Sequence, residues 1–470
     1  MDFRDVSVAD LATRVHAKEL SARELVGHAL DRIDALDRHL GAFTAVDGDR
    51  ALADAARIDE WIAAGEQVGA LAGIPIGVKD LEHAAGFVTT YGSAVHAGDA
   101  PAEIDSVLVS RLRAAGCIVV GKTNTPEHGF KGVTDNPVFG PSRNPWDRER
   151  TPGGSSGGSA SAIAAGMIPL ATGSDGGGSI RIPASICGLS GFKPSQGRVP
   201  AGGPTPPGAG VLSTKGPMTR RVRDAALVLD ACVGPEPTDL ASFPGLHDPW
   251  APQLDDVGAP ERIVYSPTMW GAAVDHDVAA AVETAVERLA AAGTEVVIVD
   301  QVFEADPTLA WFRLWCAYRA RSQGHLRDTP SWELIDPDLR SMIDYGEQLG
   351  AVEMVEALDA CHLLNHRLET EVFSHAPLLV CPTIAGRPPA VGAAQGTVDG
   401  EDTPGWVAFT PWVNLTRNPA GSVACGVAPD GLPVGLQVIG RQREDLSVLA
   451  AMAAAEDLFA DLVPPLPEVL

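Results

Sequence analysis

The sequence predicts an α/β fold, in which a single large domain has a central mixed β-sheet covered by helices on both faces. From Gly73 onward, short apolar runs alternate with amphipathic helical patterns, as strand–helix–strand units do. The 470 residues are 45% hydrophobic and 20% charged, which is enough to bury a sizeable core. No internal repeat and no clear linker divides the chain. We therefore expect one domain over residues 1–470.

The elements are expected in the following order. Residues 7–66 are predicted to be helical, with a capping box at Ser21 and Glu24 and a further helix over 49–64. Strands over 73–79 and 117–120 flank a helix over 105–114. Later helices are expected over 223–232, 275–292 and 444–459, strands over 263–265, 295–299 and 378–381, and mostly helix over 301–376. A loop over 384–404 precedes a hairpin with arms 422–427 and 432–439.

Charge and cysteine content restrict the partners and the compartment. The net charge of −26 comes from 35 basic and 61 acidic residues, which argues against a nucleic acid or an anionic membrane surface. The seven cysteines include no CxxC pair and predict free thiols in a reducing compartment. No signal-type segment and no apolar run of about 18 residues is present. We expect a cytoplasmic protein that neither binds nor crosses a membrane.

Two glycine-serine clusters, GGSSGGS over 153–159 and GSDGGGS over 173–179, indicate a site built from main-chain amides and hydroxyls. Neither cluster has the lysine of a phosphate-binding P-loop, and the first follows a loop, unlike a dinucleotide fingerprint. Matches to the G-x-S-x-G elbow of α/β-hydrolases and, at Ser190–Lys193, to the S-x-x-K of β-lactamases lack their partner motifs.

A serine nucleophile with a lysine base fits better. Lys79 ends an apolar run, where burial would lower its pKa, although a simple ion pair with Asp80 weighs about equally. The second cluster supplies a serine preceded by three glycines, whose amides can converge on an oxyanion.

Several motifs in fixed order resemble the amidase signature family of serine amidohydrolases. They include GIPIGVKD, GKTNTPEHG, RNPWD, GGSSGGSASAIAAG, GSDGGGSIRIPASICGLSGFKPS, NLTRNPAGSVACG and LPVGLQVIG, and they span most of the chain. The resemblance implies a Ser-cisSer-Lys triad of Ser179, Ser155 and Lys79, with a cis peptide at Gly154–Ser155. It also implies oxyanion amides from Gly176, Gly177, Gly178 and Ser179, and supporting roles for Ser156, Ser174, Asp175 and Arg181. Gly176 stands where the family usually has a larger residue, so a looser oxyanion loop is expected.

The family's layout divides the domain into an N-terminal helical layer (1–66), a signature core (67–230), a variable substrate-shaping region (231–410) and C-terminal strands with a helix (411–470). The resemblance implies amide hydrolysis through a serine acyl-enzyme, with no metal and no cofactor. Small-molecule amides or carbamates are the expected partners of a monomer or homodimer.

The sequence leaves open which substrate the protein binds and which related reaction it catalyses. The aromatic excess in the variable region, from Phe303 to Tyr345, hints at bulky or aryl amides, and Trp406, Phe409 and Trp412 could line the same pocket. Carbamate or ester cleavage, the A subunit of the tRNA-dependent amidotransferase, and a catalytically silent amide-binding protein are the rivals. The pair His362 and His366 has metal-ligand spacing but no third ligand, and Cys187 is expected to be buried and structural.

Overall fold

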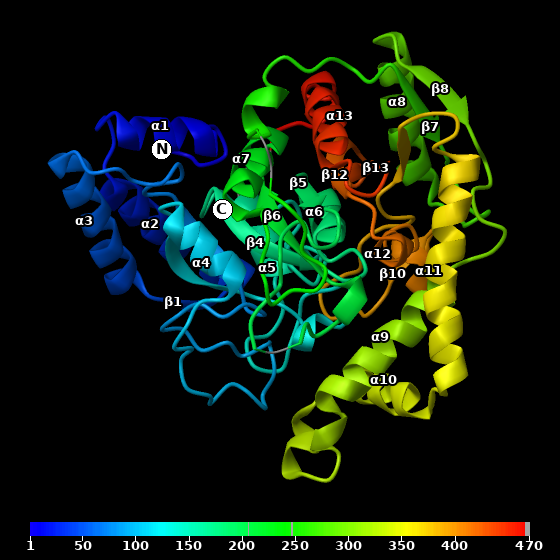
Figure 1. The fold of residues 1–470 in the computed structure, drawn as a ribbon, viewed down its shortest axis with the longest axis horizontal. Coiled ribbons are helices and arrows are strands. Elements are labelled where there is room, and N and C mark those ends of the chain that lie inside the picture. Colours follow the sequence, from blue (N-terminus) through cyan, green and yellow to red (C-terminus); the bar gives the residue numbers. More distant parts are fainter. Residues whose placement is uncertain (205, 246–247, 466–470) are drawn as a thin grey trace.

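One mixed sheet runs through the computed structural model, which describes residues 1–204, 206–245 and 248–465 (Figure 1). Eleven strands of the described chain pair in the order β1-β3-β2-β4-β6-β5-β12-β13-β9-β7-β8. In that order their bounds are Phe43–Val46, Ile118–Thr123, Pro75–Lys79, Leu170–Asp175, Thr214–Thr219, Ser190–Lys193, Ala420–Val427, Pro433–Gly440, Leu378–Pro382, Arg262–Tyr265 and Glu295–Ile298. β2 is parallel to β3 and β4, and β7 is parallel to β8 and β9, whereas the other pairs are antiparallel.

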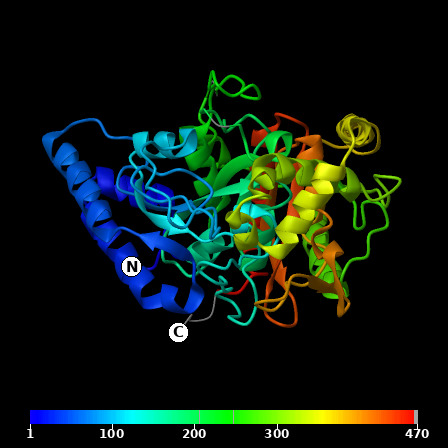
Figure 2. The same ribbon diagram turned by 90° about the horizontal axis from the view of Figure 1, so that it is seen from below.

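Thirteen α-helices of the described chain surround this sheet. They are α1 (Val8–His16), α2 (Ala22–Leu40), α3 (Gly48–Ala64), α4 (Val107–Ala114), α5 (Gly157–Ala164), α6 (Arg181–Cys187), α7 (Val222–Cys232), α8 (His276–Ala291), α9 (Thr308–Gln323), α10 (Pro337–Gln348), α11 (Ala351–Glu371), α12 (Pro411–Thr416) and α13 (Asp445–Leu458). The helices α1–α3 lie at one end of the molecule and α9–α11 toward the other (Figures 1 and 2).

Helices cover both faces of the sheet, as the sequence predicts. A Cβ atom at Gly421 of β12 would touch Met452 of α13, and one at Gly191 of β5 would touch Ala184 of α6. Gly421 pairs with Phe192, the neighbour of Gly191, and successive residues of a strand point to opposite faces. α13 and α6 therefore pack on opposite sides.

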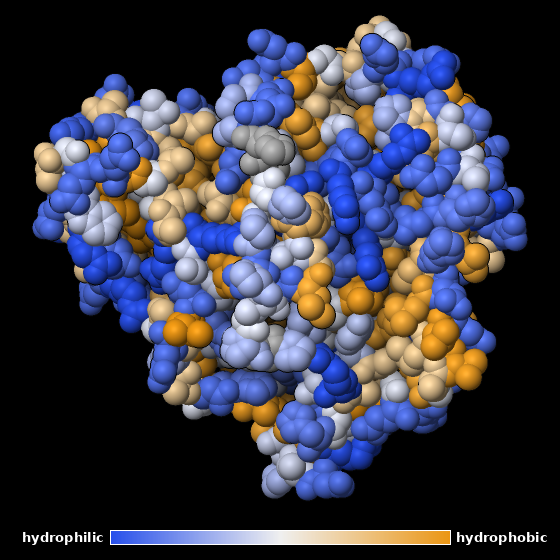
Figure 3. All heavy atoms as spheres, viewed as in Figure 1, coloured by the Kyte–Doolittle hydropathy of each residue, from blue (hydrophilic) through white to orange (hydrophobic). Residues whose placement is uncertain are grey.

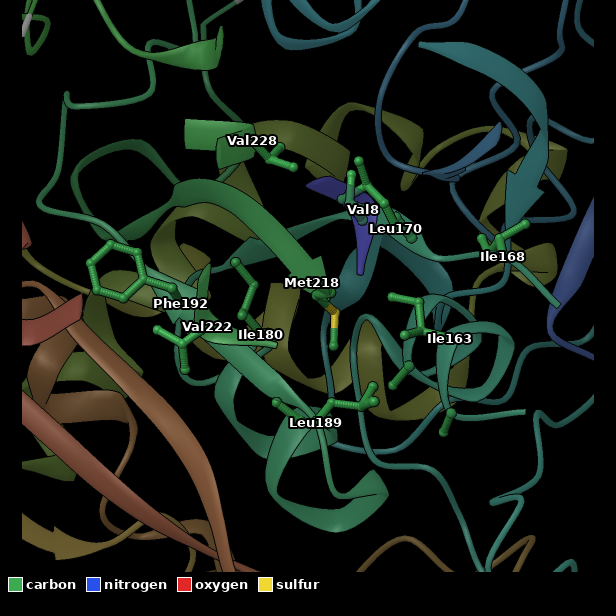
Figure 4. Close-up of a cluster of buried hydrophobic side chains, with 14 of the residues drawn as sticks. Val8, Ile163, Ile168, Leu170, Ile180, Leu189, Phe192, Met218, Val222 and Val228 are labelled. Atoms are coloured by element: carbon green, nitrogen blue, oxygen red, sulfur yellow. The ribbon is translucent and has the colours of Figure 1, made fainter. Parts of the chain in front are cut away.

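The core of the sheet lies around the strands that carry the glycine-serine clusters. Leu170 of β4, Phe192 of β5 and Met218 of β6 are almost fully buried, and Figure 4 shows them with side chains of α5 and α7. At the surface, apolar side chains gather over α9 and α11 (Figure 3). The exposed apolar residues there are Leu309, Val352, Val355, Leu358 and Leu363.

Two predictions of local structure are wrong, and one group of strands was not predicted. The expected helical segment 7–66 contains β1, which pairs with β3. The expected loop 384–404 contains a small hairpin of β10 (Gly396–Val398) and β11 (Glu401–Thr403). The stretch from Thr151 to Thr219 holds β4, β5 and β6, which the sequence did not indicate, because glycine, serine and alanine give little strand signal. Among the described helices, none is both long and apolar enough to cross a bilayer.

Candidate active site

Lys79 ends the buried strand β2, and its side chain lies among three serine hydroxyls. The Nζ atom is 2.8 Å from Ser155 Oγ, 2.9 Å from Ser156 Oγ and 3.0 Å from Ser174 Oγ. The Lys79 side chain is fully buried. Asp80, the alternative partner for this lysine, instead forms a buried ion pair of 2.8 Å with Lys122. The structure thus brings Lys79 to the serines of both clusters.

The surroundings of Lys79 favour its neutral form. Burial lowers the pKa of Lys79 from 10.5 to about 7, and the negative charges of Asp175 and Glu82 only partly offset this effect. Glu82 is itself paired with Lys215 at 2.7 Å, which reduces its influence. A large fraction of Lys79 is therefore unprotonated near neutral pH and can accept a proton.

Ser155 occupies a tight position before α5. The Gly154–Ser155 peptide is cis, as the resemblance implies. A Cβ atom at Gly154 would lie 2.7 Å from the main chain of Val133, so this position accepts only glycine without a shift of the backbone. Ser155 is almost fully buried, with its hydroxyl turned to Lys79.

Ser179 lies in the turn between β4 and α6. The turn begins after Asp175 and ends before Arg181, which makes a strand–turn–helix unit around the second cluster. Ser179 is partly exposed, unlike Ser155 and Lys79. Its carbonyl oxygen accepts a hydrogen bond of 3.2 Å from the Ser156 amide, which ties the two clusters together. The site therefore has one accessible hydroxyl beside a buried serine-lysine group.

A buried ion pair holds this turn. Arg181 Nε and Nη2 each donate to the Asp175 carboxylate at 2.9 Å. Arg181 also donates to Gln437 and Asn414, and the Asn414 amide donates to Asp175. Burial alone would raise the pKa of Asp175, but the charge and hydrogen bonds of Arg181 outweigh it and hold that pKa well below its usual range. The carboxylate stays ionised and rigid.

The expected oxyanion amides fall into two groups. The Gly178 amide donates to Asp175 Oδ1 at 2.7 Å, so this expected oxyanion donor already has an acceptor. Within the described residues, the amides of Gly176, Gly177 and Ser179 donate to no protein acceptor. Three of the four expected amides thus remain for a ligand.

Sequence reasoning missed several residues that support the turn. Asn414 and Gln437 come from the NLTRNPAG and LPVGLQVIG blocks, which the sequence singled out without assigning roles. Thr410 Oγ1 donates to Gly177 O at 2.8 Å, and no motif pointed to it. Glu82 follows the lysine block by two residues, and its contact with Lys215 could not be read from spacing.

Other singled-out side chains lie outside this group. Phe409, which precedes α12, and Trp412, which lies on it, are fully buried, and Trp406 is 3% exposed, so all three pack in the core rather than line an open pocket. Cys187 is buried, which raises its thiol pKa. His362 is exposed on α11 with His366, and neither belongs to any three-ligand cluster among the described residues. A groove of about 510 Å³ lies between α9 and α11, and none of the serines lines it.

Comparison with known proteins finds amidases and an amidotransferase subunit that match nearly the whole chain. A family model for amidases matches residues 24–449. The acylamidase of Rhodococcus erythropolis is 33% identical over 98% of this chain and 97% of that protein. The A subunit of the glutamyl-tRNA(Gln) amidotransferase of Anaeromyxobacter sp. (strain K) is 37% identical over 96% of each chain. The crystal structure of a bacterial aryl acylamidase of the amidase signature family superposes with a TM-score of 0.90, at 30% identity and 96% coverage of each chain.

Proposed function

The chain belongs to the amidase signature family of amide-hydrolysing enzymes, and we propose that it cleaves carboxylic amides through Ser179, Ser155 and Lys79. The observation that carries this proposal is the buried Lys79 amine, 2.8 Å from the Ser155 hydroxyl with a pKa of about 7. A lysine of this kind can act as a base where no histidine is present.

In the acylation step, Ser179 Oγ attacks the amide carbonyl carbon, and the carbonyl electron pair moves to the oxygen. Ser155 takes the Ser179 proton as it passes its own proton to neutral Lys79. The amides of Gly176, Gly177 and Ser179 stabilise the oxyanion. Preorganised donors of this kind are usually the largest single contribution to such catalysis.

The carbon–nitrogen bond then breaks, and Ser155 donates a proton to the leaving amine while Lys79 returns one to Ser155. Water attacks the acyl-enzyme by the same proton route, which releases the acid and restores the Ser179 hydroxyl. Each proton that leaves a nucleophile is thus returned to a leaving group.

We place aryl or otherwise bulky amides first among the substrates. The relatives whose names specify acylamidase and aryl acylamidase support this choice. Carbamates and esters are the alternative within the same chemistry, because they present the same carbonyl carbon to Ser179.

A second candidate function is the A subunit of a tRNA-dependent amidotransferase, favoured by the 37% identity to a protein of that kind. Such a protein would hydrolyse glutamine and act with partner subunits. Glutamine turnover that depends on a co-purified partner would support this role, whereas turnover of aryl amides by the purified chain alone supports the amidase.

Ser179→Ala tests the proposal, with Ser185→Ala as the matched control. Ser185 lies on α6, buried, and its hydroxyl has no hydrogen-bond partner among the described residues. We expect Ser179→Ala to lose about 10⁴-fold or more in kcat for a p-nitroanilide and to lose labelling by a fluorophosphonate. Ser185→Ala should retain both. Turnover or labelling that survives in Ser179→Ala would refute the assignment.

A further inference from the structure

One carbonyl group of the oxyanion loop is held from outside by a tryptophan of α9. Trp311, on α9, donates its indole Nε1–H to Gly176 O at 2.7 Å, although 135 positions separate the two residues. The indole also covers Gly177, because a Cβ atom there would lie 2.5 Å from Trp311 Cζ2. Trp311 thus fixes one peptide group of the loop.

Because a peptide group is rigid, the hydrogen bond on its carbonyl also sets the direction of its N–H on the opposite side of the loop. Gly176 C=O and Gly177 N–H belong to one planar trans unit and point in opposite directions. A donor that holds the carbonyl therefore turns the Gly177 N–H away from α9. This N–H is one of the three loop amides without a protein acceptor in the described chain. The next peptide is held at both ends, by Thr410 on Gly177 O and by Asp175 on the Gly178 amide.

The indole itself is held by its neighbours one and two turns later on α9. Trp315 stacks on Trp311 with ring centroids 5.3 Å apart and planes 18° from parallel. The Arg319 guanidinium lies 4.6 Å from the Trp315 ring centre and donates to the main-chain oxygens of His128 and Gly208. This stack connects α9 to two loops beside the site.

The same stack accounts for the glycine at position 176. A Cβ atom on Gly176 would lie 2.7 Å from Trp315 Cζ3, so Trp315 occupies the space that a larger residue would need. The glycine was expected to loosen the oxyanion loop, but Trp315 packs against the loop from outside at this position.

We propose that Trp311 is a positioning residue for the oxyanion hole, whose indole N–H orients the Gly176–Gly177 peptide so that the Gly177 amide faces the developing oxyanion. This inference rests on the proposed function of Ser179. A fixed amide needs no reorientation during attack, so its contribution belongs to the transition state more than to bound substrate.

The test compares Trp311→Phe with Trp315→Phe. Both replacements remove an indole of the same stack, but Trp315 Nε1 is buried with no hydrogen-bond partner among the described residues. Only Trp311→Phe therefore loses a hydrogen bond to the loop. We expect Trp311→Phe to lower kcat for an aryl amide roughly tenfold with KM changed less than about twofold, and Trp315→Phe to lower kcat less than about threefold.

An arylboronic acid, which forms a tetrahedral adduct on a catalytic serine, gives the second readout. Its affinity should fall in Trp311→Phe by about the same factor as kcat, while affinity for the carboxylate product stays within about twofold. Replacing Trp311 by 3-benzothienylalanine keeps the ring shape, removes the N–H and should reproduce the loss without a cavity. Equal effects of the two phenylalanine variants, a change in KM alone, or wild-type kcat with benzothienylalanine would overturn the inference.

Fluorophosphonate labelling of the wild type distinguishes a failure of the proposed function from a failure of the proposed role of Trp311. A wild type whose Ser179 is not labelled would overturn the proposed function together with the inference. Normal labelling of Ser179, with Trp311→Phe no worse than Trp315→Phe, would overturn the role of Trp311 alone.

Discussion

The pH dependence of turnover should follow the proton of Lys79. Burial lowers the pKa of Lys79 from 10.5 to about 7, a fall of roughly 3.5 pH units. The folded protein therefore disfavours the charged form of the Lys79 amine by about 5 kcal/mol relative to an amine in water. Since the base must be neutral, we expect kcat/KM to rise about tenfold per pH unit below a midpoint near 7 and to level off above it.

Two neighbouring charges allow the midpoint to be moved in either direction. Glu82 raises the pKa of Lys79, so Glu82→Gln should shift the midpoint to lower pH by about half a unit to one unit. Lys215→Met removes the cation that pairs with Glu82, so it should shift the midpoint to higher pH. The assay is kcat/KM for an uncharged p-nitroanilide between about pH 5 and 9.5, with folding checked by circular dichroism at each end. A midpoint near pH 9–10 would refute the lowered pKa of Lys79, and shifts of the opposite sign would refute lysine as the base.

Three further predictions concern stability as well as catalysis. Lys79→Met should abolish turnover yet raise the free energy of unfolding. This gain should be largest below about pH 7 and shrink toward pH 10, because between these pH values unfolded lysine keeps a proton that folded Lys79 releases. Urea unfolding at about pH 6.5 and 9.5 measures the gain, and equal gains at the two pH values would contradict the prediction. Arg181→Met should cost about 3–5 kcal/mol in urea unfolding because it strands the buried Asp175 charge, whereas Arg223→Met, which breaks an exposed pair with Asp457, should cost less than about 1 kcal/mol. Burial raises the pKa of Glu456 from 4.5 to about 7, so the wild type loses stability as the pH rises through this range. Replacing the residue, as in Glu456→Gln, should therefore raise Tm more at about pH 8 than at pH 5. A rise in Tm that does not depend on pH would exclude the titration of Glu456 as its cause.

Features with strong local signals were predictable from the sequence. The capping box of Ser21 and Glu24 begins α2, and the hairpin expected over 422–439 is β12 and β13. Helices α7, α8 and α13 lie within one or two residues of their predicted bounds. Caps, turns and amphipathic periods are set by neighbours in the chain, which is why they can be read there.

Contacts between distant segments could not be predicted. Asn414 and Gln437 reach Arg181 only because α12 and β13 pack beside α6, and Trp311 meets Gly176 only because α9 lies across the oxyanion loop. Lys79 and the serine after three glycines, Ser179, were proposed from the residues themselves, whereas Ser155 and the complete triad were named from a resemblance. Nothing in a single sequence states which indole finds a carbonyl acceptor 135 positions away.

The buried pair of Asp175 and Arg181 serves the base as well as the turn. β2 ends at Lys79 and its parallel neighbour β4 ends at Asp175, so the sheet places both side chains at the same edge. An unpaired carboxylate there would raise the pKa of Lys79 further and keep the amine protonated near neutral pH. Arg181 offsets that charge while it fixes the carboxylate that holds the Gly178 amide. One ion pair thus keeps the lysine neutral enough to accept a proton and keeps the oxyanion loop in place.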